Sequence, residues 1–320
     1  MLPELYERWF VEWCGRPSPV ESRSTCAECA MLPGAPELPP EGPFDAETRC
    51  CTYHPHLAPH FVGAILERGS DVGRATVRAR IAGRIGVSPL GLGPTPQYAR
   101  LPRGRGFGRN RDLTCPFLAD GRCSIWSHRG AACAAFHCKY DRGVLGHWFW
   151  GLQVVAFQAV ERALMRWLLT RMALDAAACD ALLRAPADEA LDARAWGGWR
   201  GREEAYFLEA ARLIEPLSFA EVAALGGAEL NGLAQAVRTA AAQIDATPPE
   251  RVRRNDAVVH HIGVNGRTRL QNPGVPFDLI ELSSELAERL RRLEESATTG
   301  LGLDDPLLRR LLDWQVLLPA

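Results

Sequence analysis

The sequence predicts a mainly α-helical protein with an irregular N-terminal module and a small α+β domain at its C-terminal end. Eight of the ten cysteines fall between Cys26 and Cys138, in a region rich in glycine and proline. Alanine and leucine at helical spacing dominate the middle of the chain, from Gly146 to about residue 244. After Thr247 the pattern changes to short β-type runs. We therefore expect three domains, over residues 1–145, 146–248 and 249–320.

The N-terminal region is expected to contain short helices separated by loops. Residues 1–13 predict an amphipathic helix with Leu5, Trp9 and Trp13 on one face, and a second short helix is expected at 57–68. Residues 74–111 contain nine arginines and no acidic residue. The first part of this arginine-rich segment favours a helix. The second part, from Ser88 to Gly108, is rich in glycine and proline and predicts a loop.

The middle of the chain is expected to be helical throughout. The most apolar stretch, from Trp148 to Leu174, is interrupted by charged residues, so it indicates an amphipathic helix and no membrane span. We therefore expect no membrane partner. The predicted helices cover Gly146 to about Leu183, 202–215, 218–225 and 228–244.

The C-terminal region combines a hairpin with short helices. Two β-type runs surround Asn265-Gly266, which is the strongest short signal for a hairpin. Ser283 is placed to cap a following helix, and Pro306 to Leu317 predict a last amphipathic helix. This combination is typical of a winged-helix-like domain, which could recognise a protein or peptide partner.

Composition excludes several classes of protein. Of the 320 residues, 47% are hydrophobic and 23% are charged, and the net charge is −1, so there is no global attraction to nucleic acid or to a membrane. The N-terminus lacks the apolar core of a signal peptide, so we expect a cytoplasmic protein. Disulfides are disfavoured in the reducing cytosol, where clustered cysteines more often bind metal or act in redox chemistry.

The cysteines of the N-terminal block come in pairs, which predicts a metal site. Thiolates bind zinc and iron–sulfur clusters, and four of them suit either one Zn²⁺ or one 4Fe–4S cluster. Eight cysteines make two such sets. The predicted metal ligands are Cys26, Cys29, Cys50, Cys51, Cys115, Cys123, Cys133 and Cys138.

The spacing favours an iron–sulfur cluster over zinc but leaves both open. Zinc modules usually pair two regular CxxC motifs, and here only Cys26 and Cys29 form one. A proline follows Cys115, as it follows a ligand in ferredoxins. We therefore expect one or more iron–sulfur clusters, most simply 4Fe–4S, with Zn²⁺ as the alternative.

The second half of this block resembles a known family. Cys115-Pro-Phe-Leu, Gly-Arg-Cys123-Ser-Ile-Trp, Arg-Gly-x-x-Cys133 and Phe-His-Cys138 are similar to the YkgJ-type, or CxxCxxCC, cysteine-cluster family. Its members are described as zinc- or iron-chelating, and flagellin lysine N-methylases are among its relatives. Twenty residues separate Cys29 from Cys50, where the family has two. The resemblance covers roughly residues 26–140 and implies that all eight cysteines belong to the metal site. It implies no substrate.

Residues beside the cysteines are candidates to surround the metal site. His54, His137, Lys139 and Arg109 lie close to ligands in the sequence and could hydrogen-bond to them; Lys139 is the only lysine of the chain. The arginine-rich segment could offset thiolate charge. A second interpretation of the arginine-rich segment is an anion or nucleic-acid site. It would use Phe107 and the arginines Arg100, Arg103, Arg105, Arg109 and Arg111. Cys14 and Cys179 are expected to be packing residues.

Three classes of function remain open. The first is an enzyme that uses the metal site for redox chemistry or for modifying a protein or peptide. The second is a protein-interaction module with structural zinc. The third, a nucleic-acid-binding protein, is the least favoured. The sequence has no HExxH, GxSxG or helix-opening GxGxxG motif, so it identifies no catalytic or other cofactor-binding residues.

Overall fold

The computed structural model describes residues 2–26, 28–34, 42–100, 106–182, 189–262, 267–275 and 278–320. Helices account for about 53% of it, and the sheets are small and antiparallel, which confirms the mainly α prediction. The chain folds into two compact units. The first comprises Met1–Pro19, Cys26–Phe136 and Gln153–Ala234, and the second comprises Val20–Thr25, His137–Leu152 and Gln235–Ala320.

Helices dominate the first unit, and only very short strands join them. Two long helices, α6 (Gly143–Arg171) and α10 (Phe219–Asp245), contribute residues to both units. The other helices are α1 (Glu4–Cys14), α2 (Pro59–Arg68), α3 (Asp71–Ala82), α4 (Pro96–Arg100), α5 (Ala131–Ala134), α7 (Ala176–Leu182), α8 (Glu189–Trp196) and α9 (Glu203–Ile214), with 3₁₀ turns η1 (Arg111–Leu113), η2 (Trp126–His128) and η3 (Gly197–Trp199). The strands are β1 (Val87–Ser88), β2 (Gly91–Leu92), β3 (Leu118–Ala119) and β4 (Arg122–Cys123).

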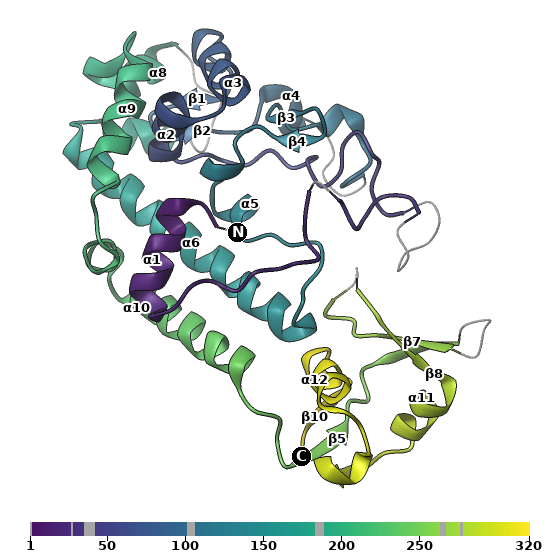
Figure 1. Ribbon diagram of the computed structural model, residues 1–320. Coiled ribbons are helices and arrows are strands. Elements are labelled where there is room, and N and C mark those ends of the chain that lie inside the picture. Colours follow the sequence, from purple (N-terminus) through teal and green to yellow (C-terminus); the bar gives the residue numbers. More distant parts are fainter. Residues whose placement is uncertain are drawn as a thin grey trace. The chain divides into compact units, whose positions relative to one another are not determined.

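Aromatic side chains of α1 form the centre of the first unit. The Tyr6 ring stacks on Phe157 of α6 with centroids 3.9 Å apart, and Trp13 stacks on Phe219 of α10 at 4.9 Å. The Trp13 indole N–H also donates to the carbonyl of Ala234 at 2.9 Å. Figure 1 shows α1, in purple, lying beside α6. The predicted amphipathic helix at the N-terminus is therefore confirmed, and burial of its aromatic face is its main source of stability.

A close glycine contact and a serine cap fix the helices near the cysteine-bearing loops. A Cβ on Gly63 of α2 would lie 1.9 Å from the carbonyl oxygen of Phe207, so only glycine lets α2 and α9 meet. Ser70 caps α3 by accepting from the Gly73 N–H at 3.0 Å. The Ser70 hydroxyl donates in turn to the carbonyl of Ser124 at 2.7 Å. This cap ties α3 to the residue that follows Cys123.

The structure differs from the sequence expectation between Ser88 and Gly108. This part of the chain was expected to be loop, but it contains the pairing of β1 with β2 and the short helix α4. The prediction of two helices on either side of residue 227 is confirmed. The backbone of α10 is helical before and after Gly227, but Gly227 itself has φ 60° and ψ −145°, which breaks the helix there.

The second unit contains two three-stranded antiparallel sheets with helices packed on them. One sheet has the order β10-β5-β9 and the other β6-β7-β8. Its core contains Leu270, Ile280, Leu311 and Trp314. The elements are β5 (Arg251–Arg254), β6 (Val259–Ile262), β7 (Arg267–Gln271), β8 (Ile280–Ser283), α11 (Ser284–Arg291), β9 (Glu295–Ala297), η4 (Thr298–Leu301), α12 (Asp305–Asp313) and β10 (Leu317–Pro319).

The predicted hairpin of the second unit is confirmed. Strands β6 and β7 pair in antiparallel register, with Val259 opposite Gln271, whereas the turn residues 265 and 266 lie outside the described ranges. Ser283 caps α11 as predicted, accepting from the Leu286 N–H at 3.2 Å. The last helix is shorter than expected. It ends at Asp313 because the chain turns at Gln315, where φ is 51°, and continues as β10 against β5.

Hydropathy adds one further finding. Among the helices in the described ranges, none combines the length and the apolar character needed to cross a membrane.

Candidate metal centre

Seven of the eight predicted metal ligands lie in the first unit, on turns and short elements. All seven are free thiols, and Cys115 is buried while the others are half-buried. Cys123 belongs to β4 and Cys133 to α5. The seven are Cys26, Cys29, Cys50, Cys51, Cys115, Cys123 and Cys133.

Two buried threonines hold the adjacent pair Cys50-Cys51 in place. The Thr48 hydroxyl donates to the Gly108 carbonyl at 2.8 Å, and the Gly108 N–H donates to the Thr52 hydroxyl at 2.7 Å. Gly108 has φ +77°, and a Cβ there would lie 2.0 Å from the Phe44 ring. Only glycine meets both conditions, so the backbone on either side of the two cysteines depends on Gly108.

A short hairpin brings the next two cysteines to the same place. The Cys115 N–H donates to the Cys51 carbonyl at 2.7 Å. Strands β3 and β4 pair Leu118 with Cys123, and the Ser124 N–H donates to the Phe117 carbonyl at 2.8 Å. The hairpin therefore returns Cys123 toward Cys115, which is itself fixed to the Cys50-Cys51 turn.

The thiols lie near enough to one another to affect each other's ionisation. The pKa of Cys26 is raised to about 11, mainly by burial and also by the charges of Cys50, Cys29 and Cys123. Burial also raises the pKa of Cys115 to about 11, with contributions from Cys123 and Cys50. The pKa of Cys50 is strongly raised, first by its hydrogen bond with Cys51 and then by burial. Without a bound metal ion, these thiols are therefore neutral at pH 7.

The helix α5, which carries Cys133, is hydrogen-bonded to a half-buried glutamate, Glu161. The Ala131 N–H at the start of α5 donates to Glu161 Oε1 at 2.9 Å, and the Tyr6 hydroxyl hydrogen-bonds to the same oxygen. Burial raises the pKa of Glu161 to about 7. Burial also raises the pKa of Cys133, and the charges of Cys115 and Cys123 act in the same direction.

A buried arginine, Arg129, lies beside these thiols. Its side chain donates to the carbonyls of Cys133 at 3.0 Å and Trp126 at 2.9 Å, and it lies 3.4 Å from the centroid of the Trp126 ring. Burial lowers the pKa of Arg129, whereas the charges of Cys123 and Cys133 raise it. Arg129 was not among the predicted site residues. Its place between Cys123 and Cys133 in the sequence is the signal that could have identified it.

Within the arginine-rich segment, the charge of Arg80 acts on a predicted ligand, Cys115. Its buried guanidinium donates to the carbonyls of Ile85 at 3.1 and 3.0 Å and Gly93 at 2.5 Å, and burial lowers its pKa while the charge of Cys115 raises it. Other arginines of the segment pair with carboxylates. Arg78 contacts Glu204 at 3.0 Å, Arg84 contacts Glu203 at 3.0 Å, and Arg111 contacts Glu47 at 2.7 Å.

The eighth predicted ligand, Cys138, belongs to the second unit. Its thiol lies 3.6 Å from the Ser24 hydroxyl, and its N–H donates to that hydroxyl at 3.2 Å. Two residues after Ser24 the chain reaches Cys26. Ser24 therefore ties the segment that precedes one predicted ligand to another predicted ligand.

A buried ionic cluster in the second unit contains the neighbour of Cys138. Lys139 Nζ lies 3.4 Å from Asp278 Oδ1, and the exposed fractions of the two side chains are 1% and 0%. The Arg23 guanidinium donates to both oxygens of Asp278 at 3.1 Å. The only lysine of the chain is thus a partner of Asp278 in the interior of the second unit.

The other residues predicted to surround the metal site have partners of their own. His54 Nε2 lies 2.9 Å from the Thr114 carbonyl, next to Cys115, and its ring stacks on Tyr98 at 4.0 Å. His137 packs against Trp150 at 4.4 Å. Arg109 donates to the carbonyls of Pro43 at 2.9 Å and Gly42. Among these, His54 is the one held beside a predicted ligand of the first unit.

The donor set fits a soft metal or an iron–sulfur cluster by its chemistry. Several free thiols share one region, and two buried cations, Arg129 and Arg80, lie beside it. Over the described ranges, however, no three side chains of His, Cys, Asp or Glu converge closely enough to enclose one ion. The structure therefore gathers the predicted ligands of the first unit without giving them the geometry of a bound metal.

Comparisons with known proteins add no relative. No family model matches the sequence, and no similar protein was found among curated proteins or solved structures. The resemblance to the YkgJ-type family therefore depends on the cysteine motifs themselves.

Proposed function

We propose that this chain is a metal-binding protein of the cysteine-cluster type. The eight predicted cysteines would hold one or more iron–sulfur clusters, or zinc as the alternative. The observation that carries the proposal is the gathering of thiols from four separate parts of the chain, at residues 26–29, 50–51, 115–123 and 133, into one region of the first unit.

Burial and charge explain why such a region needs a cation. Each thiolate formed there would be partly desolvated and repelled by its neighbours, as the raised pKa values of Cys26, Cys115 and Cys133 indicate. Arg129 offsets only part of this charge. A bound metal deprotonates thiols outright and would supply the missing positive charge.

The chemistry depends on which metal is bound. An iron–sulfur cluster supplies one-electron redox chemistry, and this would fit a redox enzyme or one that modifies a protein or peptide. Zinc held by four thiolates is structural and would fit an interaction module. In that case residues 249–320, which we assign as winged-helix-like, would bind the partner. The second unit that contains them has its own core and two sheets.

Purification without oxygen tests whether the chain binds an iron–sulfur cluster or zinc. We expect a brown protein that contains iron and acid-labile sulfide and gives an EPR signal on reduction. A colourless protein with about two zinc ions per chain would select the interaction module instead. A protein that retains neither metal under these conditions would contradict the proposal.

Single substitutions test the ligand set. Cys115→Ser and Cys138→Ser are each expected to lower the metal content of the purified chain. Cys14→Ser is the matched control, because Cys14 lies in α1 and is not a predicted ligand. If Cys138→Ser kept its full metal content while Cys115→Ser lost it, the site would be restricted to the first unit.

Nucleic-acid binding is the least supported function. Arg111 already pairs with Glu47 and Asp45, and Arg109 holds backbone carbonyls, while Arg103 and Arg105 lie outside the described residues. Nucleic-acid binding would be supported if the chain bound oligonucleotides in a salt-dependent way and lost this binding when Arg103 and Arg105 were replaced. A cytoplasmic location and a protein or peptide partner remain part of the proposal.

A further inference from the structure

A cavity of about 350 Å³, here called the aromatic cavity, adjoins the cysteine-bearing turns of the first unit. Its volume falls in the range of ~300–1,000 Å³ that is usual for small-molecule sites. Thr52, which directly follows Cys51, lines it. His54 also lines it and bonds to the Thr114 carbonyl, next to Cys115. The cavity therefore lies beside two predicted metal ligands but contains neither.

Three aromatic rings line this cavity, those of Tyr53, Tyr98 and Phe107. The Tyr98 ring stacks on His54 with centroids 4.0 Å apart, and the Phe107 ring meets Phe44 edge to face at 5.5 Å. Neighbouring rings thus hold two of the walls, while 39% of Phe107 stays exposed to a ligand. Walls that are already in place favour a flat aromatic ligand, because ring pairs attract beyond the area they bury and little order has to be created on binding.

His56 supplies a polar group that a ligand can reach. Its side chain lines the cavity and is exposed, whereas His54 has its Nε2 bonded to the Thr114 carbonyl and its Nδ1 enclosed. Desolvation in the hollow and the charge of Arg80 lower the pKa of His56, so its ring is neutral at pH 7. A neutral imidazole offers one N–H donor and one nitrogen acceptor. A hydroxyl group can both donate and accept, so it suits the ring in either tautomer.

Charge distinguishes among the aromatic ligands that would fit. Among the described residues, the lining of the aromatic cavity contains no carboxylate, arginine or lysine. The positive charge of Arg80 lowers the pKa of both His54 and His56, so a cation in the cavity would be repelled. An anion would lose its hydration without gaining a partner in the lining. An uncharged ligand is therefore favoured.

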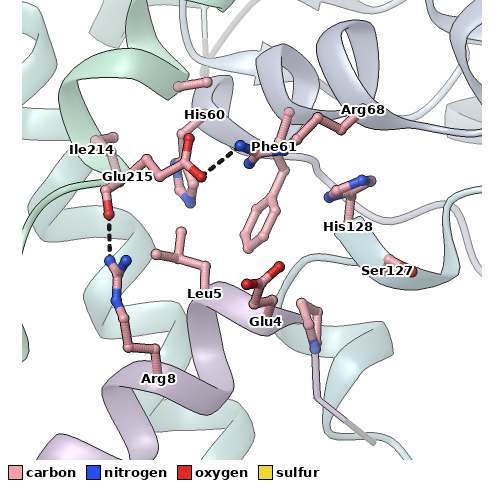
Figure 2. Close-up of a pocket in the computed structure, with 13 residues that line it drawn as sticks. Glu4, Leu5, Arg8, His60, Phe61, Arg68, Ser127, His128, Ile214 and Glu215 are labelled. Atoms are coloured by element: carbon pink, nitrogen blue, oxygen red, sulfur yellow. Dashed lines mark hydrogen bonds and ion pairs between the residues drawn. The ribbon is translucent and has the colours of Figure 1, made fainter.

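The cavity between α1, α2 and α9 lacks these features. Figure 2 shows Arg68 and Arg8 both bonded to Glu215, the first to its carboxylate at 2.5 Å and the second to its carbonyl. Both ring nitrogens of His60 in its lining are enclosed by protein atoms. The polar groups of that cavity named here are thus paired or out of reach, and we assign it no ligand.

We propose that the aromatic cavity binds an uncharged phenol. The phenol ring would lie against Tyr98 and Phe107, and its hydroxyl would hydrogen-bond to His56. The cavity includes no predicted metal ligand, so binding does not depend on the metal. A chain that retains no metal could still bind the phenol, and a metal-loaded chain could fail to bind it, so the two proposals are tested separately.

Three probes of similar size separate hydrogen bonding from charge. p-Cresol, toluene and benzylamine, which is a cation at pH 7, are each titrated into the full chain and followed by ligand-observed NMR. p-Cresol is expected to bind about tenfold more tightly than toluene, because only p-cresol bonds to His56. Benzylamine is expected to bind more weakly than p-cresol. No binding of p-cresol at millimolar concentration, equal binding of p-cresol and toluene, or tighter binding of benzylamine would each overturn the proposal.

Two substitutions of His56 test the hydrogen bond. His56→Leu removes both ring nitrogens and is expected to weaken p-cresol binding about tenfold, with toluene binding unchanged. His56→Gln keeps a donor and an acceptor and is expected to retain most of the p-cresol affinity. The matched control is His261→Leu, which replaces an exposed histidine on β6 of the second unit and should change neither. Equal binding of p-cresol by His56→Leu and the unchanged chain would show that His56 is not its partner.

The variant Phe107→Ala tests the location of the ligand. It removes one wall of the cavity and is expected to weaken both p-cresol and toluene, because both rings lose the same contact. Trp148→Ala is the matched control, since Trp148 is an exposed aromatic residue outside the cavity. If Phe107→Ala bound both probes as tightly as this control, the ligand would lie elsewhere and the proposal would be wrong.

Discussion

The largely half-buried thiols of the first unit and the buried ion cluster of the second differ in how their charge is compensated. In the second unit Asp278 accepts from Lys139 and from both nitrogens of the Arg23 fork, and a further bond comes from the Leu279 N–H at 3.0 Å. In the first unit the thiols raise each other's pKa, and Arg129 counters this only in part.

The difference shows which region is complete as folded. The ions around Asp278 are paired within the chain, which is the condition for tolerating buried charge. The thiols become charged only if something outside the chain compensates them. The comparison therefore separates an ion cluster that is paired within the chain from the thiol region to which we assign the proposed metal, and three substitutions test this contrast.

The largest effect is expected for Asp278→Asn. This change leaves Lys139 and Arg23 without their common anion, and removing one partner of a buried ion pair typically costs about 3–5 kcal/mol. Denaturant unfolding of the full chain, followed by the fluorescence of its tryptophans, measures the loss. Glu281→Gln is the matched control, because Glu281 pairs with Arg267 and Arg269 at the surface of the same unit and should matter much less. Equal losses of unfolding free energy for the two variants would show that the buried cluster contributes no more to stability than the surface ion pairs.

A smaller effect, which depends on pH, is expected for Glu161→Gln in the first unit. The pKa of Glu161 is raised to about 7 by burial, against an ordinary value near 4.5. The folded state therefore holds a proton between about pH 4.5 and 7 that the unfolded state has released, so stability falls as pH rises through this window. The total loss is on the order of 3 kcal/mol.

The glutamine variant lacks this titration but keeps an acceptor for the Ala131 N–H and the Tyr6 hydroxyl. It is expected to match the unchanged chain near pH 4.5 and to be more stable than it at pH 8. Unfolding curves collected at a series of pH values measure the difference between the two chains. A difference that stays constant between pH 4.5 and 8 would contradict the raised pKa of Glu161.

Local patterns predicted the local elements, but not the buried partners of charged residues. The α1 face, the β6–β7 hairpin and the Ser283 cap follow from spacing and turn chemistry, and all three are found. Lys139 was placed near the metal site because it follows Cys138. Its contact with Asp278 joins residues 139 positions apart, and no local pattern reports such a pairing.

The same reasoning explains which cations of the site could be predicted. Nine arginines at 74–111 suggested general charge compensation, but Arg78 on α3 and Arg84 in the turn after it pair with carboxylates of other elements. Arg80 and Arg129 are directed inward, where backbone carbonyls hold them beside cysteines. Residue type alone gave all these arginines the same role, and only their burial distinguishes them.

The smallest of the three effects is expected for Arg129→Gln, and it is a change in reactivity. In metal-free protein the arginine lowers the pKa of Cys26, Cys123 and Cys133, so its removal raises those pKa values further. Fewer thiolates are then present at pH 8, and alkylation by iodoacetamide should slow by about threefold to tenfold. Arg111→Gln is the matched control, since Arg111 pairs with Glu47 and Asp45 at the surface and should leave the rate unchanged. If Arg129→Gln reacted as fast as the control, the thiols would not depend on this cation, and the contrast with the Asp278 cluster would rest on the thiols' burial alone.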